Sequence, residues 1–136
     1  MESKLKHLEM IQAVINRMAN NSFLLKGWSV TLISALLALA AANSDRRFVF
    51  VAILPLLMFW LLDAYFLRQE RLFRKLYDHV RTLAESAIDF SMDTAPYVNA
   101  TASWGRVMVS RTLLIFYGAI AVGVIIAVLL STPKPS

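Results

Sequence analysis

The chain has 136 residues, a length typical of a single domain. Hydrophobic residues make up 58% of it and its mean hydropathy is +0.59, above the usual apolar share of about 45–50%. The excess lies in long blocks, which indicate membrane helices rather than a soluble core. There is no cysteine, which excludes disulfides and thiolate metal or redox sites. The net charge of +5 comes from Lys and Arg residues beside the apolar blocks, which favours anionic lipid over nucleic acid.

The first predicted element is an amphipathic helix over residues 3–26. Its seam residues follow a 3-4-3-4-3 spacing: Leu8, Ile11, Ile15, Met18, Ser22 and Leu25. Val14 widens this seam toward the stripe of a helix packed in a bundle. The alternative is a helix lying flat on a membrane surface. It is favoured less, because the polar face carries both charge signs and no Trp.

Residues 23–42 form the first predicted membrane span. Twenty mostly apolar residues at about 1.5 Å each cover the roughly 30 Å hydrocarbon core. Gly27, Thr31 and Ala35 are four residues apart, a spacing that lets helices approach closely in lipid or that arises by chance in an Ala-rich helix. Residues 26–42 also resemble a cleaved signal peptide, although the stretch before them is too long for an ordinary charged leader.

A short polar turn over residues 43–47 leads into the second predicted span, residues 48–67, so these two spans are antiparallel neighbours. Asp63 is the one acidic residue within a predicted span. A charge near the bilayer centre costs about 2.5–3.5 kcal/mol, and less near the edge. Lys26 lies at the matching depth of the first span. Two interpretations stay open: a structural Asp63–Lys26 pair, or an acid that lines a wet cavity or pore.

A cytoplasmic stalk is predicted over residues 68–92 as a continuation of the second span. It carries a second seam, at Phe66, Gln69, Phe73, Leu76, Val80, Leu83, Ala87 and Phe90. The stalk would rise about 37 Å and the first helix about 35 Å, so the two seams are expected to pack as an antiparallel hairpin outside the membrane. Basic residues next to the span are placed for anionic headgroups, at about 1 kcal/mol each, or for a protein partner: Arg68, Arg71, Arg74 and Lys75.

Residues 93–105 are predicted to be an extended return loop, with a helix starting near Ser103 and running into the third span, residues 113–130. Asn99 and Thr101 match a glycosylation acceptor, a short motif that often arises by chance. The third span carries a ridge of small residues that marks a close helix contact, within the chain or between copies: Ala119, Gly123 and Ala127.

The distribution of Lys and Arg predicts the orientation. Residues 1–26 and 68–111 together hold eleven of them, whereas the opposite side holds three, namely Arg46, Arg47 and Lys134. Positive residues concentrate on the cytoplasmic side of a membrane. The N-terminus and stalk are therefore expected in the cytoplasm, and the C-terminus in the periplasm of a bacterial inner membrane.

Catalytic chemistry has little support in the sequence. His7 and His79 are the only histidines, without metal-ligand spacing, and both are expected on the solvated surface of the stalk helices. No phosphate-binding loop or nucleophile motif is found in the 136 residues. We expect no enzyme activity, no catalytic residue, no metal and no cofactor.

Three stretches resemble a family of small bacterial membrane proteins: residues 59–78 (FWLLDAYFLRQERLFRKLYD), residues 11–20 (IQAVINRMAN) and residues 23–27 (FLLKG). They are similar to RipA-like octameric membrane proteins. The layout also resembles SLATT domains, paired membrane helices proposed as pore-forming effectors, although a third span departs from that pattern. The RipA-like resemblance implies a homo-oligomer and assigns no catalytic residue.

The sequence thus predicts an all-α membrane protein, a single domain over residues 1–136 with three transmembrane helices. The first two continue as a cytoplasmic antiparallel hairpin. The expected function is an oligomeric inner-membrane scaffold or partner platform. The alternatives are a pore with Asp63 facing water, or a small subunit of a larger membrane complex. Expected partners are copies of the chain in a ring, anionic lipids, and another membrane or cytoplasmic protein, with no nucleic acid.

Overall fold

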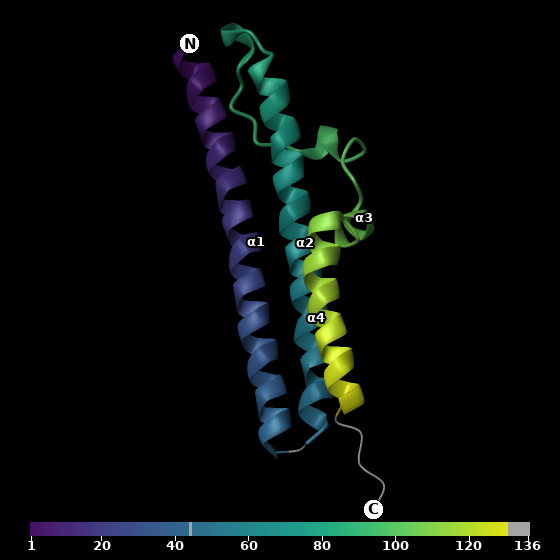
Figure 1. Cartoon of the computed structure of the whole chain (residues 1–136). Coiled ribbons are helices and arrows are strands. Elements are labelled where there is room, and N and C mark those ends of the chain that lie inside the picture. Colours follow the sequence, from purple (N-terminus) through teal and green to yellow (C-terminus); the bar gives the residue numbers. More distant parts are fainter. Residues whose placement is uncertain (44, 131–136) are drawn as a thin grey trace, which may run out of the picture.

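The computed structural model describes residues 1–43 and 45–130 (Figure 1). These residues form helices and no strand, which confirms the predicted all-α class. The polar tail 131–136, with Lys134, and Ser44 of the predicted turn lie outside the described residues. The elements are α1 (Glu2–Asn43), α2 (Arg47–Arg81), the 3-10 helices η1 (Glu85–Ala87) and η2 (Ala95–Tyr97), α3 (Trp104–Met108) and α4 (Arg111–Leu130).

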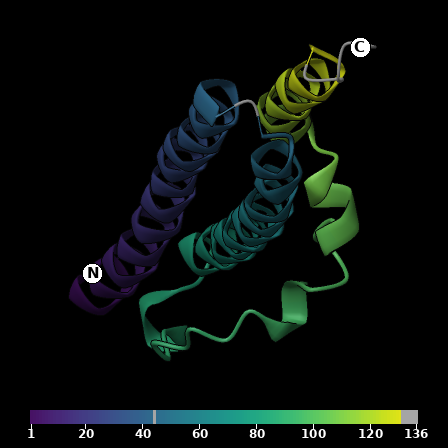
Figure 2. The same ribbon diagram turned by 90° about the horizontal axis from the view of Figure 1, so that it is seen from below.

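α1 and α2 lie side by side and antiparallel, and they dominate the molecule (Figures 1 and 2). α1 has 42 residues, a rise of about 63 Å, so the predicted segments 3–26 and 23–42 are one continuous helix. Gly27 does not interrupt it, because the roughly 1 kcal/mol that a glycine costs a helix is spread over a long run of helix-forming neighbours. α2 likewise contains Pro55 without ending there.

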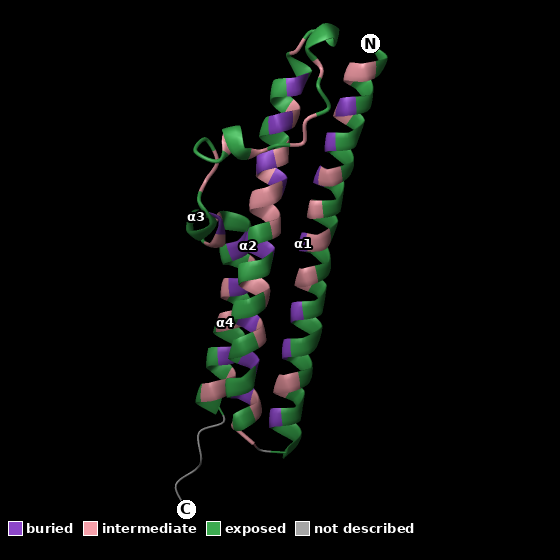
Figure 3. Ribbon diagram, turned by 180° about the vertical axis from the view of Figure 1, so that it is seen from behind, coloured by how far each residue is buried: buried purple, intermediate pink, exposed green. Residues whose placement is uncertain are grey.

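The contact predicted between the two seams is present. Ile11 and Ile15 of α1 are buried against Leu76 and Val80 of α2 in a cluster of their own, away from the predicted spans. Figure 3 shows buried residues on the sides of α1 and α2 that face each other. The residues at 3-4 spacing that form the two predicted seams are therefore the residues that pack α1 against α2 in the hairpin.

The predicted stalk, residues 68–92, is wrong in its second half, because α2 ends at Arg81. Asp89 accepts a hydrogen bond of 3.0 Å from the Ser91 amide, and Asp93 one of 2.9 Å from the Ala95 amide. Such side-chain bonds compete with helical backbone bonds. The chain instead folds back on the hairpin and covers the Ile11 cluster with partly buried apolar residues, at Leu83, Ile88, Met92 and Tyr97.

The return loop leads to α3, and Ser103 accepts a hydrogen bond from the Arg106 amide as the N-cap of that helix. The start near Ser103 agrees with the prediction, but one continuous helix through the third span does not, because α3 ends at Met108 and α4 begins at Arg111. The Met108 carbonyl accepts a 2.8 Å hydrogen bond from Trp60 Nε1 of α2. That bond and the buried Val107 fix the end of α3 against α2.

α1, α2 and α4 are each long and apolar enough to cross a membrane, by length and composition. Where the three helices run together, they share the larger of the two buried apolar clusters, which includes Ile33, Val49, Leu56, Leu113 and Tyr117. α4 packs mainly against α2. The fold is therefore a three-helix bundle at one end and a two-helix hairpin at the other.

Candidate functional site: a buried polar cluster

Five polar residues meet where the apolar parts of α1, α2 and α4 come together. We call them the polar cluster: Ser22, Lys26, Ser29, Asp63 and Tyr117. Asp63, Ser29 and Tyr117 have exposed fractions of 0%. A polar group away from water must find its partners within the protein. The bonds within this cluster therefore decide what it can do.

Asp63 and Lys26, which the sequence places at matching depth, are in contact. Lys26 Nζ lies 2.6 Å from Asp63 Oδ2, and the Asp63 side chain is fully buried while that of Lys26 is 20% exposed. The other carboxylate oxygen, Asp63 Oδ1, accepts a hydrogen bond from the Ser22 hydroxyl. Lys26 Nζ also donates to Ser22 Oγ at 2.9 Å. Both ions are therefore bonded to a shared serine as well as to each other.

Ser29 and Tyr117 are the two members of the cluster that the sequence analysis did not name, and Tyr117 bonds to Asp63 directly. Its hydroxyl donates a 2.9 Å hydrogen bond to Asp63 Oδ2. The ring stacks on Trp60, with centroids 5.8 Å apart and planes 10° from parallel, and it meets Phe116 edge-on. A signal was present, since Tyr117 is the one residue with an aromatic hydroxyl in the predicted third span. No partner for Tyr117 could be named from the sequence, because nothing in the sequence indicates which face of α4 meets α2.

The Asp63 carboxylate accepts hydrogen bonds from three side chains and has no exposed surface. This arrangement holds a fixed charge pair and joins three helices. Asp63 has no surface open to solvent in the chain, whereas the Lys26 side chain is 20% exposed. Among residues 1–43 and 45–130, no three His, Asp or Glu side chains gather as metal ligands.

Three exposed aromatic residues lie at the level of the polar cluster: Trp28, Tyr65 and Trp104, which we call the aromatic belt. Trp104 Nε1 donates a 3.1 Å hydrogen bond to the Leu61 carbonyl, and its ring lies 6.1 Å from that of Tyr65. Because Lys26 contacts Asp63 and the two helices are antiparallel, Trp28 lies near the level of Leu61. Exposed Trp and Tyr side chains are typical of the membrane–water interface.

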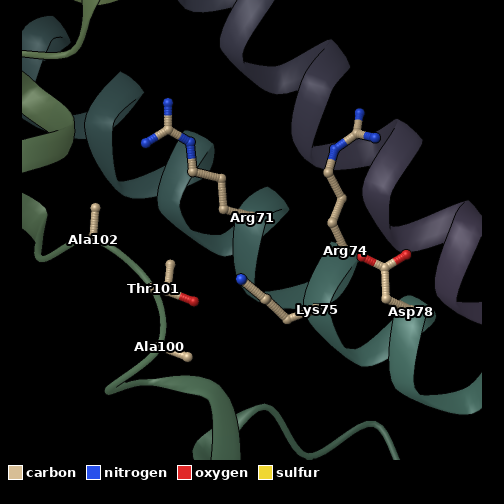
Figure 4. Close-up of a pocket in the computed structure, with 7 residues that line it drawn as sticks. All are labelled: Arg71, Arg74, Lys75, Asp78, Ala100, Thr101 and Ala102. Atoms are coloured by element: carbon tan, nitrogen blue, oxygen red, sulfur yellow. The ribbon is translucent and has the colours of Figure 1, made fainter.

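The four basic residues predicted to meet headgroups have different surroundings. Arg68 Nε donates a 3.2 Å hydrogen bond to the Ala102 carbonyl of the return loop. Arg74 donates two hydrogen bonds, of 2.7 and 3.2 Å, to Glu70 Oε1. Arg71 and Lys75, together with Arg74, line a groove between α2 and the loop (Figure 4).

The small residues predicted to make helix contacts are not brought together within the chain. Gly27, Ala35, Ala119 and Gly123 are exposed, and only Ala127 packs partly against the core. A Cβ built on Gly27 or Gly123 would meet nothing within 4 Å. No contact within the described chain requires a glycine at either position.

The expectation that both histidines lie on the solvated surface is wrong for His7. His79 is exposed, but His7 is fully buried and its Nε2 lies 2.8 Å from the Ser91 carbonyl, to which it donates. Its ring lies 5.6 Å from that of Phe90. His7 is four residues before Ile11 and extends the seam by one turn, which is the signal that the sequence offered.

No family model, no curated protein and no solved structure matches the chain. The resemblance to RipA-like and SLATT proteins therefore stays a prediction. Function is inferred from the geometry of the bundle.

Proposed function

We propose that this chain is an integral protein of a bacterial inner membrane that self-assembles into a non-enzymatic scaffold or partner platform. α1, α2 and α4 cross the bilayer, the hairpin extends into the cytoplasm and the end of α4 reaches the periplasm. Three observations support this placement: the length and hydropathy of the three helices, the aromatic belt and the excess of Lys and Arg at the hairpin end.

One observation carries the proposal of self-assembly: the outward face of α1. Six small residues at three- and four-residue spacing are all exposed on it, over about 22 Å of the span. They are Gly27, Thr31, Ser34, Ala35, Ala38 and Ala42. The opposite face holds buried residues such as Ser29, Ile33 and Ala40. In lipid, small side chains let another helix approach closely, and a second copy of the chain is the partner that we infer.

The subunit number of the purified full chain tests this proposal, measured by native mass spectrometry from a mild detergent. We expect one oligomeric species for the unaltered chain. We expect Gly27→Leu, and Gly123→Leu as a second variant, to lower the subunit number, because a large side chain there would keep a neighbouring helix from approaching. Within the chain itself, a Cβ at either position meets nothing within 4 Å. Leu54→Ala is the control, because Leu54 is 63% exposed on α2 and lies outside these faces.

Two outcomes would contradict this proposal, the first its contact face and the second self-assembly itself. An oligomer that survives both glycine substitutions would show that the small-residue faces are not the contact. An unaltered chain that is monomeric or unstable on its own would favour a small subunit of a larger membrane complex.

The alternative is a pore-forming or channel-like protein with Asp63 facing water. The 0% exposure of Asp63 and its bonds to Lys26 and Tyr117 favour the scaffold over the pore. Ion flux through liposomes containing the protein separates the two. A scaffold gives the flux of empty liposomes for the unaltered chain and for Asp63→Asn alike. A flux that Asp63→Asn changes would support the pore and reject the scaffold.

A further inference from the structure

A groove of about 240 Å³ runs between α2 and the return loop, on the hairpin side of the aromatic belt (Figure 4). One wall is the basic face of α2 and the other is the backbone of the loop: Arg71, Arg74, Lys75, Asp78, Ala100, Thr101 and Ala102. The 3.2 Å hydrogen bond from Arg68 Nε to the Ala102 carbonyl ties the loop wall to α2. Thr101 Oγ1 donates a 2.9 Å hydrogen bond to the Tyr97 carbonyl, which braces the same wall from within the loop.

The charges that line the groove do not cancel. Arg74 is neutralised by Glu70, with Nη2 2.7 Å from Glu70 Oε1, and Asp78 lies 4.0 Å from Arg81. Within residues 1–43 and 45–130, neither Arg71 nor Lys75 forms an ion pair or a side-chain hydrogen bond. The groove therefore presents two uncompensated cations beside a fixed backbone wall, which is complementary to an anion.

The position of the groove along α2, relative to the aromatic belt, indicates that the anion is a lipid headgroup. Arg71 lies about 9 Å and Lys75 about 15 Å along α2 from Tyr65 of the aromatic belt. The polar headgroup layer extends roughly 5–7 Å beyond the hydrocarbon core. Side chains on a helix lean toward its N-terminus, which for α2 is the direction of the span. The long Arg71 and Lys75 side chains thus lean back toward headgroup phosphates while their Cα atoms stay outside them.

We propose that this groove binds the phosphate of an anionic phospholipid headgroup, with Arg71 and Lys75 as its charge partners and residues 100–102 as its second wall. A seated headgroup differs from the diffuse attraction of any basic surface, because it depends on the shape of the groove as well as on charge. The inference rests on the membrane placement in the proposed function and is independent of self-assembly.

Lipid retention by the purified full chain tests the charge requirement, measured by native mass spectrometry during titration with phosphatidylglycerol. Phosphatidylcholine serves as the zwitterionic comparison and is expected to bind weakly. We expect Arg71→Gln to weaken phosphatidylglycerol binding about fivefold and Arg71→Gln/Lys75→Gln about thirtyfold. Arg17→Gln is the matched control, because Arg17 is exposed on α1 at about the height of Leu72 and lies outside the groove. A change below twofold is expected for Arg17→Gln, whereas a loss equal to that of Arg71→Gln would reject a seated headgroup.

A substitution that leaves the charge unchanged tests the shape requirement. Ala100 is exposed on the loop wall, so Ala100→Trp fills the groove and keeps every cation. We expect it to weaken phosphatidylglycerol binding several-fold, while Ala87→Trp, on exposed η1, has no effect. Unchanged binding by Ala100→Trp would overturn the proposal.

Inorganic phosphate separates a lipid from a soluble ligand. We expect millimolar inorganic phosphate not to displace bound phosphatidylglycerol. Phosphate that binds the groove while the lipid is not retained would assign the groove to a soluble anion and overturn the proposal. The same spectra report the subunit number: lost lipid in an intact oligomer rejects the groove alone, and a monomer that retains lipid rejects self-assembly alone.

Discussion

Tyr117 donates a hydrogen bond of 2.9 Å to Asp63 Oδ2, across 54 positions of sequence. Lys26 contacts the same oxygen at 2.6 Å. One carboxylate oxygen therefore joins α4, α2 and α1 at a single depth. In an apolar bundle such a point fixes how far each helix can slide along its neighbours, because any shift would leave a buried polar group without its partner.

Removing the Tyr117 hydroxyl should destabilise the bundle. In Tyr117→Phe the ring can still stack on Trp60, but Asp63 loses one of its three donors, a loss that costs about 1–3 kcal/mol for a buried group. Unfolding in detergent micelles, followed by circular dichroism during SDS titration, measures the change. Tyr65→Phe is the control, since Tyr65 is 43% exposed and donates no hydrogen bond among the described contacts. Equal stability of the two variants would contradict a role for the Tyr117–Asp63 bond.

Removing the cation should cost more than removing the phenol. Lys26→Met leaves the buried Asp63 carboxylate without a counter-ion, a change that typically costs about 3–5 kcal/mol. Replacing both ions in Lys26→Met/Asp63→Leu should recover a large part of that loss, because the uncompensated charge is gone. The same SDS titration measures the four-member cycle. Arg47→Met breaks an exposed pair with Asp45 and should change stability little. Additive effects of the two single substitutions would refute coupling between Lys26 and Asp63.

The tip of the hairpin should respond to acid through Glu85. A hydrogen bond from the Met1 ammonium at 2.7 Å, and amide bonds from Ser3 at 2.8 Å and Lys4 at 3.2 Å, hold the pKa of this carboxyl below its ordinary value. Because the pKa is lower in the folded state, the carboxylate stabilises the fold above its unfolded pKa and loses that effect as pH falls through the folded pKa.

Glu85→Gln should therefore lower the thermal unfolding temperature at pH 7, and the difference from the unaltered chain should shrink as pH falls below the ordinary Glu pKa of about 4.3. Thermal scans by circular dichroism between pH 3 and pH 7 measure it. Glu9→Gln, at an exposed position of α1, should show no such pH-dependent difference. A difference that persists unchanged at pH 3 would exclude the Glu85 carboxylate as its cause.

The parts of the fold that were predictable depend on patterns repeated along a helix. The spacing of Ile11, Ile15, Leu76 and Val80 defined both seams before any contact was known. The depth of Lys26 relative to Asp63 followed from counting residues on either side of a short turn. Both arguments use the constant rise of a helix, which changes little with tertiary context.

The parts that were missed depend on single local contacts. α2 ends at Arg81, where the next residue, Thr82, donates from its hydroxyl to the His79 carbonyl. Further along, Asp89 and Asp93 bond to nearby amides, and the apolar pattern of the predicted stalk does not reveal these local contacts. The break between α3 and α4 involves the bond from Trp60 to the Met108 carbonyl, which joins residues 48 positions apart. Tyr117 joins the polar cluster only because α4 turns that side toward α2.

The absence of any break in α1 at Gly27 couples the two ends of the molecule mechanically. In the membrane placement proposed above, the angle at which α1 crosses the bilayer is also the angle of its cytoplasmic half, because one unbroken helix forms both. Membrane helices change their tilt with the thickness of the surrounding bilayer. A thinner or thicker membrane would therefore tilt the whole of α1 and displace the hairpin tip sideways. The displacement would be small near the Lys26–Asp63 pair and largest at the tip.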